Sequence, residues 1–270
     1  MVDDLAGAAQ NQLDQWELHR DGEAHHGAGS TVLPVRTSDR ARAVLKISLP
    51  DAASAHEHLV LRRWGGNGAV RLLRADPRNH ALLLERLGPE SLATVPDVDA
   101  CEIVAGLYKR IHVPAMPQLR TLTSYVEQWT SDFAALPRSA PIPHRLVEQA
   151  IVLGRELADE PATTVVHGDL DYESVLAADR EPWLVIAPKP MNGDPHSELA
   201  PMLWSRWGEL SGSIRDGVRR RFYTLVDAAG LDEERARGWI VVRVVREATR
   251  KLGDPTSLTK YVALAKAVQD

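Results

Sequence analysis

The chain has 270 residues, which suits one large domain or two modest ones and allows a buried core without disulfide or metal crosslinks. Hydrophobic residues make up 44% and charged residues 26%, which argues against disorder and against a membrane protein. The 37 acidic and 32 basic residues give a net charge of −5, so there is no strong positive field for nucleic acid or an anionic membrane. We expect neither as a partner.

Cysteine content and the N-terminal residues indicate the compartment. Cys101 is the single cysteine, so an internal disulfide and a thiolate zinc cluster are excluded, which fits a reducing compartment. Residues 1–10 lack the basic start and apolar stretch of a signal peptide, and Arg243 interrupts the apolar run 240–245. We expect a cytoplasmic chain with no leader and no membrane-spanning helix.

The first third of the chain is predicted to order its elements as strand, strand, helix, strand, strand. The helix covers residues 52–64, with Asp51 or Ser54 as its cap. The first two strands form a hairpin around a polar turn, and Asp76–Asn79 supplies turn chemistry between the last two. The four predicted strands are residues 31–35, 43–47, 69–73 and 81–84.

From about Asp97 the pattern becomes mainly helical, and the helices are interrupted once by short strands. The predicted helices are residues 99–112, 122–135, 144–157, 213–230 and 231–252. The predicted strands are residues 163–166, 174–176 and 183–186, with a turn at 179–182. A small mixed sheet followed by a larger helical half predicts two lobes with a cleft between them.

A candidate reactive loop, His167-Gly168-Asp169-Leu170, lies between two of these strands. Reacting groups are common on loops held by rigid elements. The Asp169 carboxylate could accept a proton from a substrate hydroxyl as a general base. The alternative is structural, with Asp169 capping a turn and His167 bonding to the backbone.

Several motifs follow this loop in a fixed order, and together they resemble the aminoglycoside phosphotransferase family. They are Val175-Leu176, Trp183-Leu184-Val185-Ile186, Pro188-Lys189-Pro190 and Gly193-Asp194-Pro195, and the likeness extends back to Trp16, Asp21-Gly22-Glu23 and Ala43-Val44-Leu45-Lys46. The chain is most similar to the streptomycin 6-kinase and hydroxyurea phosphotransferase branch, which reads HGDLHxxNVL, IDPKP and GDP.

The resemblance implies an α+β, two-lobed protein-kinase-like fold. It has a small N-terminal antiparallel-sheet lobe with one helix and a larger, mainly helical C-terminal lobe. Residues 1–87 would form the nucleotide-binding lobe with its hinge, and residues 88–270 would carry the catalytic loop and the acceptor pocket. A small-molecule substrate and a nucleotide would be the partners.

The resemblance also implies roles for individual residues in an ATP site. Lys46 looks like the lysine that pairs with the nucleotide phosphates, and Glu57 looks like its helix partner. Glu85 and Leu87 belong to the segment that resembles the hinge beside the adenine ring. Residues 25–30 would be the loop above the phosphates. Without the family pattern, Lys46 would be an exposed strand lysine and Glu57 part of a solvated helix face.

Two positions depart from the family where its members hold magnesium. Ser174 replaces the asparagine of the catalytic loop, and Ala187 replaces the aspartate after the next strand. Magnesium requires hard oxygen ligands, and a methyl group offers none, so Mg²⁺ is in doubt and no metal ligand is assigned. Three nearby carboxylates, Asp171, Glu173 and Asp194, could replace the lost ligands, although Asp194 could instead serve a turn before Pro195.

A basic segment near the C-terminus bears on the acceptor. Residues 240–252 include Arg243, Arg246, Arg250 and Lys251, with Glu247 as the single acid. If this helix lines the acceptor pocket, a polycationic aminoglycoside would meet like charge there. The alternative is that these side chains face water.

Three readings of function follow from these residues. The first is an ATP-dependent O-phosphotransferase of the antibiotic-resistance type, acting on a hydroxyl of an aminoglycoside-like or other small molecule with Asp169 as base. The second is a pseudokinase, which binds nucleotide or another ligand without efficient transfer because Ser174 and Ala187 replace the metal ligands. The third is an interaction module in which Lys46 and Glu57 are surface charges.

Overall fold

A computed structural model describes residues 2–27, 29–50, 55–210 and 212–269. Its contacts divide the chain into two compact units, which we describe separately. Unit 1 comprises Met1–Glu90 and Leu176–Pro190, and unit 2 comprises Ser91–Val175 and Met191–Asp270. The predicted division at residue 87 assigns functions to the parts and stays a prediction.

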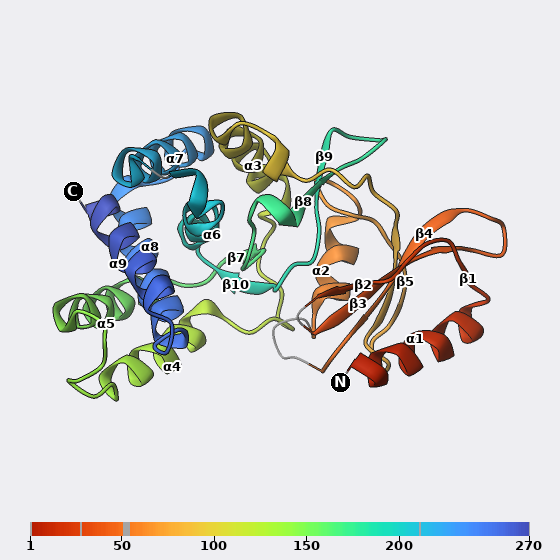
Figure 1. Ribbon diagram of the computed structural model, residues 1–270, viewed down its shortest axis with the longest axis horizontal. Helices are drawn as coiled ribbons and strands as arrows, with labels where there is room; N and C mark the ends of the chain where they lie inside the picture. The colour runs from red at the N-terminus through yellow and green to blue at the C-terminus, as the bar shows by residue number, and fades with distance from the viewer. Residues whose placement is uncertain (1, 28, 51–54, 211, 270) are drawn as a thin grey trace. The chain divides into compact units, whose positions relative to one another are not determined.

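Within the described residues, unit 1 is built on a six-stranded sheet (Figure 1). Its strand order is β1-β3-β4-β6-β5, with β2 also paired to β3, and every pairing is antiparallel. The strands are β1 (His19–Arg20), β2 (His25–Gly27), β3 (Ser30–Arg36), β4 (Arg42–Ser48), β5 (Leu72–Asp76) and β6 (Ala81–Glu85). The antiparallel sheet confirms the architecture that the family resemblance implies, whereas the mixed sheet expected from the strand pattern is wrong.

The hairpin of β3 and β4 explains how the sheet positions Lys46. Along β4, Ala43, Leu45 and Ile47 are fully or almost fully buried and face the core, as the period of two in a strand requires. Lys46 is opposite Val32 in the register and therefore points to the other face. The predicted hairpin is confirmed.

The predicted strand 69–73 is shifted in the structure. Ala69 instead makes a parallel bridge to Val185, and the strand begins at Leu72. The apolar run of the sequence includes Ala69 and Val70, which are buried away from the sheet, whereas β5 is an edge strand with Leu73 half exposed. Hydrophobicity alone therefore located this strand three residues too early.

Two helices pack in unit 1 among its described residues (Figure 1). Helix α1 (Val2–Trp16), which we did not predict, contacts β3 and β4 through a helical stripe of Leu5, Ala9, Leu13 and Trp16. Helix α2 (Glu57–Trp64) ends at Gly65 in the left-handed conformation, with φ of 59°. Both predicted caps, Asp51 and Ser54, lie outside the described residues.

The hairpin of β8 (Val175–Ala177) and β9 (Trp183–Val185) confirms the predicted strand pair and turn. Arg180 in this turn ties residues 176–190 to the rest of unit 1. Its guanidinium donates to the Glu85 carboxylate at 2.7 Å and to the carbonyls of Gly66 and Ala69 at 2.8 and 2.7 Å. A segment distant in sequence thus completes unit 1.

Unit 2 is mainly helical (Figure 1). Its described helices are α3 (Asp97–Ile111), α4 (Leu122–Ala134), α5 (His144–Ala158), α6 (Ala200–Trp204), α7 (Ile214–Ala229), α8 (Glu233–Arg250) and α9 (Pro255–Gln269). Its short 3₁₀ turns are η1 (Leu92–Thr94), η2 (Tyr172–Ser174), η3 (Pro195–Leu199) and η4 (Trp207–Leu210). Helix α3 packs on α7, α5 packs on α4 and α8, and α9 packs on α7 and α8.

The predicted helices of unit 2 are confirmed as α3, α4, α5, α7 and α8, whereas α6 and α9 were missed. Asp254 accepts from the N–H groups of Thr256 and Ser257 at the start of α9, beside Pro255 at the first helical position. A two-stranded sheet, β7 (Thr164–Val166) with β10 (Met191–Gly193), lies among the helices.

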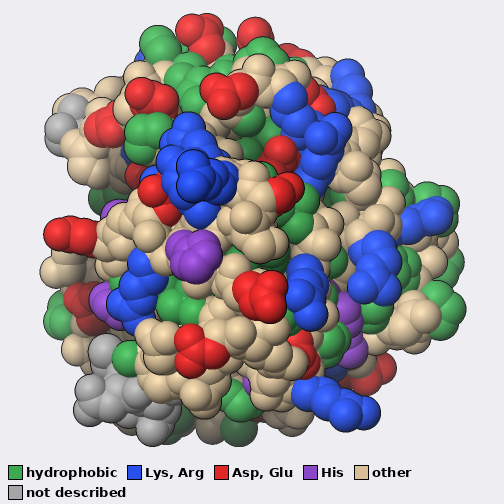
Figure 2. Space-filling model, turned by 90° about the vertical axis from the view of Figure 1, so that its right-hand side faces the viewer, with side chains coloured by type: hydrophobic (Ala, Val, Ile, Leu, Met, Phe, Trp, Pro, Cys, Tyr) green, Lys and Arg blue, Asp and Glu red, His purple; other side chains and the backbone are tan. Residues whose placement is uncertain are grey.

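In the described part of the chain, none of the helices has the length and apolarity to span a membrane. Figure 2 shows one face of the molecule, where basic and acidic side chains are interspersed.

Candidate active site

The Lys46–Glu57 pair is the most distinctive polar contact of unit 1. Lys46 Nζ donates to both carboxylate oxygens of Glu57, at 2.8 and 2.7 Å. The two side chains are 11% and 3% exposed, so the alternatives of an exposed strand lysine and a solvated helix face do not hold. Because desolvation offsets most of the attraction in a buried ion pair, an apolar pair would stabilise the fold at least as well. Stability alone therefore does not account for these two residues.

The two predicted hinge residues differ in the groups they leave available. The Glu85 carboxylate is occupied by Arg180 and by the Arg71 N–H at 2.7 Å, and the Glu85 N–H donates to the Arg71 carbonyl. Leu87 is half-buried, and among the described residues its backbone N–H and C=O have no hydrogen-bond partner. Leu87 therefore has backbone groups available for hydrogen bonding, while Glu85 is held by Arg180 and Arg71.

The segment predicted to lie above the phosphates is a tight hairpin. His25–Gly27 pairs with Ser30–Val32, and Ala28 lies outside the described residues. Gly29 has φ of +95°, a conformation that favours glycine. That this loop covers phosphates stays a prediction.

In unit 2, the backbone of the Asp169 loop is held by two buried charged groups. The Glu198 carboxylate accepts from the N–H of His167 at 2.8 Å and from the N–H of Gly168 at 2.6 Å. Arg243 donates to the carbonyl of Gly168 at 2.9 Å. Asp169 itself is partly exposed, and its N–H donates to Nδ1 of His167 at 3.3 Å. The loop thus presents the Asp169 carboxylate from a fixed backbone.

Glu198 is fully buried and carries a negative charge. Burial raises its pKa, but the hydrogen bond from His112, the fields of His112 and His167 and the Gly168 N–H outweigh this, and the pKa lies below its usual value. Nε2 of His112 is 3.4 Å from the carboxylate. The sequence interpretation missed Glu198, whose only signal is a single acid before the apolar stretch 199–203.

Asp171 and Ser174 form a closed cap at the other end of the loop. One oxygen of the Asp171 carboxylate accepts from the N–H groups of Glu173 and Ser174 at 3.1 and 3.0 Å and from the Ser174 hydroxyl at 2.9 Å. The other oxygen accepts from the Ser205 hydroxyl at 3.2 Å. Asp171 therefore caps η2, a role the sequence interpretation did not assign.

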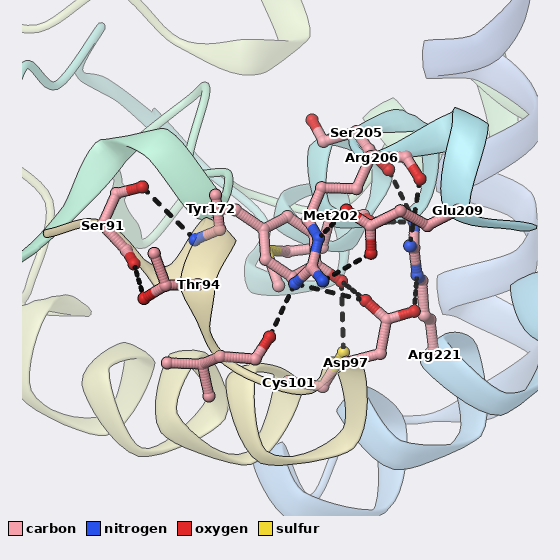
Figure 3. Close-up of polar contacts among 12 residues, drawn as sticks. Ser91, Thr94, Asp97, Cys101, Tyr172, Met202, Ser205, Arg206, Glu209 and Arg221 are labelled. Atoms are coloured by element: carbon pink, nitrogen blue, oxygen red, sulfur yellow. Dashed lines mark hydrogen bonds and ion pairs between the residues drawn. The ribbon is translucent and has the colours of Figure 1, made fainter.

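Figure 3 shows the network that fixes Tyr172 within η2. The Tyr172 hydroxyl donates to Asp97 at 3.0 Å, and Arg221 donates to the other oxygen of that carboxylate at 2.8 Å. The guanidinium carbons of Arg206 and Arg221 lie 4.8 and 5.4 Å from the centre of the Tyr172 ring. Burial raises the pKa of the neighbouring Cys101 thiol to about 12, which makes it a poor nucleophile.

Asp194 is a structural residue, as the turn alternative predicted. Its carboxylate accepts from the backbone N–H and Nδ1 of His196 at 3.0 and 2.6 Å, from Nε1 of Trp239 at 2.6 Å and from Nε of Arg235 at 2.5 Å. It caps η3 and joins this turn to α8. Burial raises its pKa, but the hydrogen bonds from His196 and Trp239 outweigh this and lower the pKa to about 2.

We expect Asp194→Asn to lower the free energy of unfolding at neutral pH by about 1–2 kcal/mol, after allowance for solvent screening. Because the folded-state pKa of about 2 lies below the ordinary aspartate pKa of 3.8, the carboxylate stabilises the fold above pH 3.8, and this contribution is lost as the pH falls towards 2. Urea unfolding of both proteins from pH 7 to pH 3 measures it. A difference in the free energy of unfolding between the two proteins that stays constant over this pH range would contradict the prediction.

The residues present do not fit the family's magnesium site. Ala187 has an exposed methyl group and φ of +53°. The Asp171 and Asp194 carboxylates are filled by protein donors, and Glu173 accepts from the Ser91 hydroxyl at 3.0 Å. Among the described residues, no three His, Cys, Asp or Glu side chains are grouped so that they could hold a metal ion. Replacement of the lost ligands by these three acids is unsupported.

The basic segment of α8 is not a uniform charged lining. Arg243 is 7% exposed and donates to the Gly168 carbonyl of the Asp169 loop. The guanidinium of Arg246 lies 5.8 Å from the Trp129 ring centre, and Arg250 is exposed and 3.4 Å from Glu247. These side chains thus have separate roles.

Comparisons with known proteins identify the family. The sequence pattern of the aminoglycoside/hydroxyurea antibiotic resistance kinase family matches residues 15–254. The chain belongs to this family. It is 41% identical to streptomycin 6-kinase of Streptomyces griseus over 268 residues, which cover 94% of this chain and 87% of the relative. It is 37% identical to hydroxyurea phosphotransferase of Kitasatospora aureofaciens, over 94% of this chain and 75% of the relative.

Solved structures confirm the kinase-like fold of this family member. An aminoglycoside phosphotransferase of Streptomyces rimosus matches with a TM-score of 0.59 and 17% identity, covering 90% of this chain and 97% of that one. A choline kinase of Streptococcus pneumoniae matches with a TM-score of 0.65 and 11% identity, covering 98% of each chain. The predicted fold and family are therefore both confirmed.

Proposed function

We propose that the protein is an ATP-dependent O-phosphotransferase that acts on a hydroxyl group of a small molecule. The observation that carries this proposal is the buried Lys46–Glu57 pair. A lysine held by a carboxylate at both oxygens has its charge fixed in position, which is what binding of a nucleotide phosphate requires. The backbone of Leu87 supplies hydrogen-bonding groups for the adenine ring.

Asp169 is the proposed base. The acceptor hydroxyl oxygen forms a bond to the γ-phosphorus of ATP, the bond from that phosphorus to the bridging oxygen breaks, and ADP leaves. The hydroxyl proton passes to the Asp169 carboxylate. Glu198 and Arg243 orient the loop before the reaction, so little reorganisation is needed when the substrates are bound.

The names of the relatives supply the first acceptors to test, streptomycin and hydroxyurea. If α8 lines the acceptor pocket, its basic residues disfavour a polycationic acceptor, because like charges repel. Neutral sugars therefore belong in the same acceptor panel.

A second candidate is a pseudokinase that binds nucleotide without efficient transfer. Ser174 and Ala187 favour it, because the first is part of the Asp171 cap and the second has no ligand atom in its side chain. Loss of one electrostatic contact to the reacting phosphate lowers a rate on the order of 10²–10³-fold.

Measurement of ADP production separates the two candidates. We expect ATP consumption to rise on the order of 10²-fold in the Ser174→Asn, Ala187→Asp double variant, because it restores two oxygen ligands. Aspartate tolerates the left-handed conformation of residue 187 better than alanine does, so this variant is expected to fold.

Adding Asp169→Asn to either background is the control, and activity should fall to that of the blank. Acceptor-dependent turnover in the unaltered protein supports a phosphotransferase. Turnover that appears only in the double variant supports the pseudokinase. ATP consumption that survives Asp169→Asn would contradict the role of Asp169 in both.

A further inference from the structure

The magnesium positions of this chain have consequences for nucleotide binding itself. We propose that the protein binds ATP without a divalent cation, so that metal-free ATP is a ligand in its own right. This inference rests on the proposed function, since it concerns the same nucleotide site. It starts from three features: the Asp171 cap, the conformation of Ala187 and the partners of the remaining carboxylates.

The first feature is that Asp171 and Ser174 satisfy each other. The Ser174 hydroxyl donates to Asp171 at 2.9 Å and has the Asp169 carbonyl as a second acceptor at 3.3 Å, and the Asp171 carboxylate receives four hydrogen bonds in all. In HGDLHxxN a histidine and an asparagine occupy these two positions, whereas here an aspartate and a serine bind each other. A carboxylate with four donors around it would lose those hydrogen bonds if it turned to a cation.

The second feature is the backbone at Ala187. Its φ of +53° is uncommon for alanine and costs about 1–2 kcal/mol relative to a right-handed conformation, whereas aspartate and asparagine adopt it more readily. The loop therefore has a conformation suited to an acidic or amide side chain, although alanine occupies the position.

The third feature is the electrostatic balance that results. A carboxylate at position 187 would repel the phosphates of metal-free ATP, and a bound cation normally offsets that repulsion. With alanine there, the repulsion is absent, and Lys46 supplies a fixed positive charge. Glu173 and Asp194 have protein partners, namely Ser91 for the first and Trp239 and Arg235 for the second, and Asp169 is reserved as the proposed base. Removal of the cation is therefore expected to change the dissociation constant of ATP little.

Isothermal titration of the full chain with ATP, in EDTA and then in excess Mg²⁺, tests the inference. We expect the two dissociation constants to agree within about threefold. The Ser174→Asn, Ala187→Asp variant is the matched comparison. It should bind ATP at least about tenfold more tightly with Mg²⁺ than with EDTA, because it regains both ligand side chains. Thermal shift with Mg²⁺ alone should leave the unaltered protein unchanged.

The outcomes separate this inference from the proposed function. If the unaltered protein binds ATP about tenfold more tightly with Mg²⁺, the inference is overturned and the proposed nucleotide site stands. If it binds no ATP under either condition, the proposed function fails and the inference fails with it. Equal binding in EDTA and in Mg²⁺, abolished by Lys46→Met, supports both.

Discussion

Replacing Lys46 with methionine is expected to abolish the binding of ATP and to lower the free energy of unfolding by about 3–5 kcal/mol. The second effect arises because Glu57, which is 2% exposed, would keep a buried charge with its lysine partner removed. Urea unfolding measures the stability, and the increase in melting temperature on addition of ATP measures binding.

Two further variants make this prediction specific. Lys46→Met combined with Glu57→Leu should regain most of the lost stability, since a buried apolar pair can replace an ion pair, but it should not regain ATP binding. The matched control is Lys109→Met, an exposed lysine of α3, which should change neither quantity. If Lys46→Met still responds to ATP as the unaltered protein does, Lys46 does not bind the phosphates.

Glu198→Gln should destabilise unit 2 strongly, by about 3 kcal/mol, although it changes one atom. A carboxylate can accept from both loop N–H groups, whereas glutamine would turn its own NH₂ towards either His167 or Gly168. Glu102→Gln on the exposed face of α3 is the matched control and should change the free energy of unfolding by no more than about 0.5 kcal/mol.

Hydrogen exchange locates the effect of Glu198→Gln. The amides of His167 and Gly168 should exchange faster in this variant than in Glu102→Gln, while the amides of β3 and β4 in unit 1 should keep their relative protection. Equal stability of the Glu198→Gln and Glu102→Gln variants would show that the loop does not depend on the carboxylate.

Much of the fold could be predicted because local patterns determine it. The alternation of apolar residues in 31–35 and 43–47 is visible in the sequence, and so is the helical spacing of most unit 2 helices. The stripe of α1 and the Asp254-Pro255 start of α9 carry equally clear signals, which we did not use. The shift of β5 has another cause, since burial of Ala69 against Val185 depends on a segment far along the chain.

The residues that hold the candidate site in position were harder to predict. Glu198 and Arg243 meet the Asp169 loop from positions 29 and 74 residues further along the chain, and no local pattern links them to it. Asp194 lies in a family motif, yet its role depends on Trp239 and Arg235 of α8. Sequence motifs could thus suggest which residues react, but the groups that hold them depend on tertiary packing.

The division of unit 1 into Met1–Glu90 and Leu176–Pro190 affects how the protein folds during its synthesis. Arg180, which anchors Glu85, Gly66 and Ala69, is synthesised only after helices α3, α4 and α5 of unit 2. During synthesis, the N-terminal sheet therefore lacks these stabilising contacts until residue 180 has been made. A fragment that stops at residue 90 would lack residues 176–190 of unit 1 and their contacts. We therefore expect it to be unsuitable for measuring nucleotide binding in isolation.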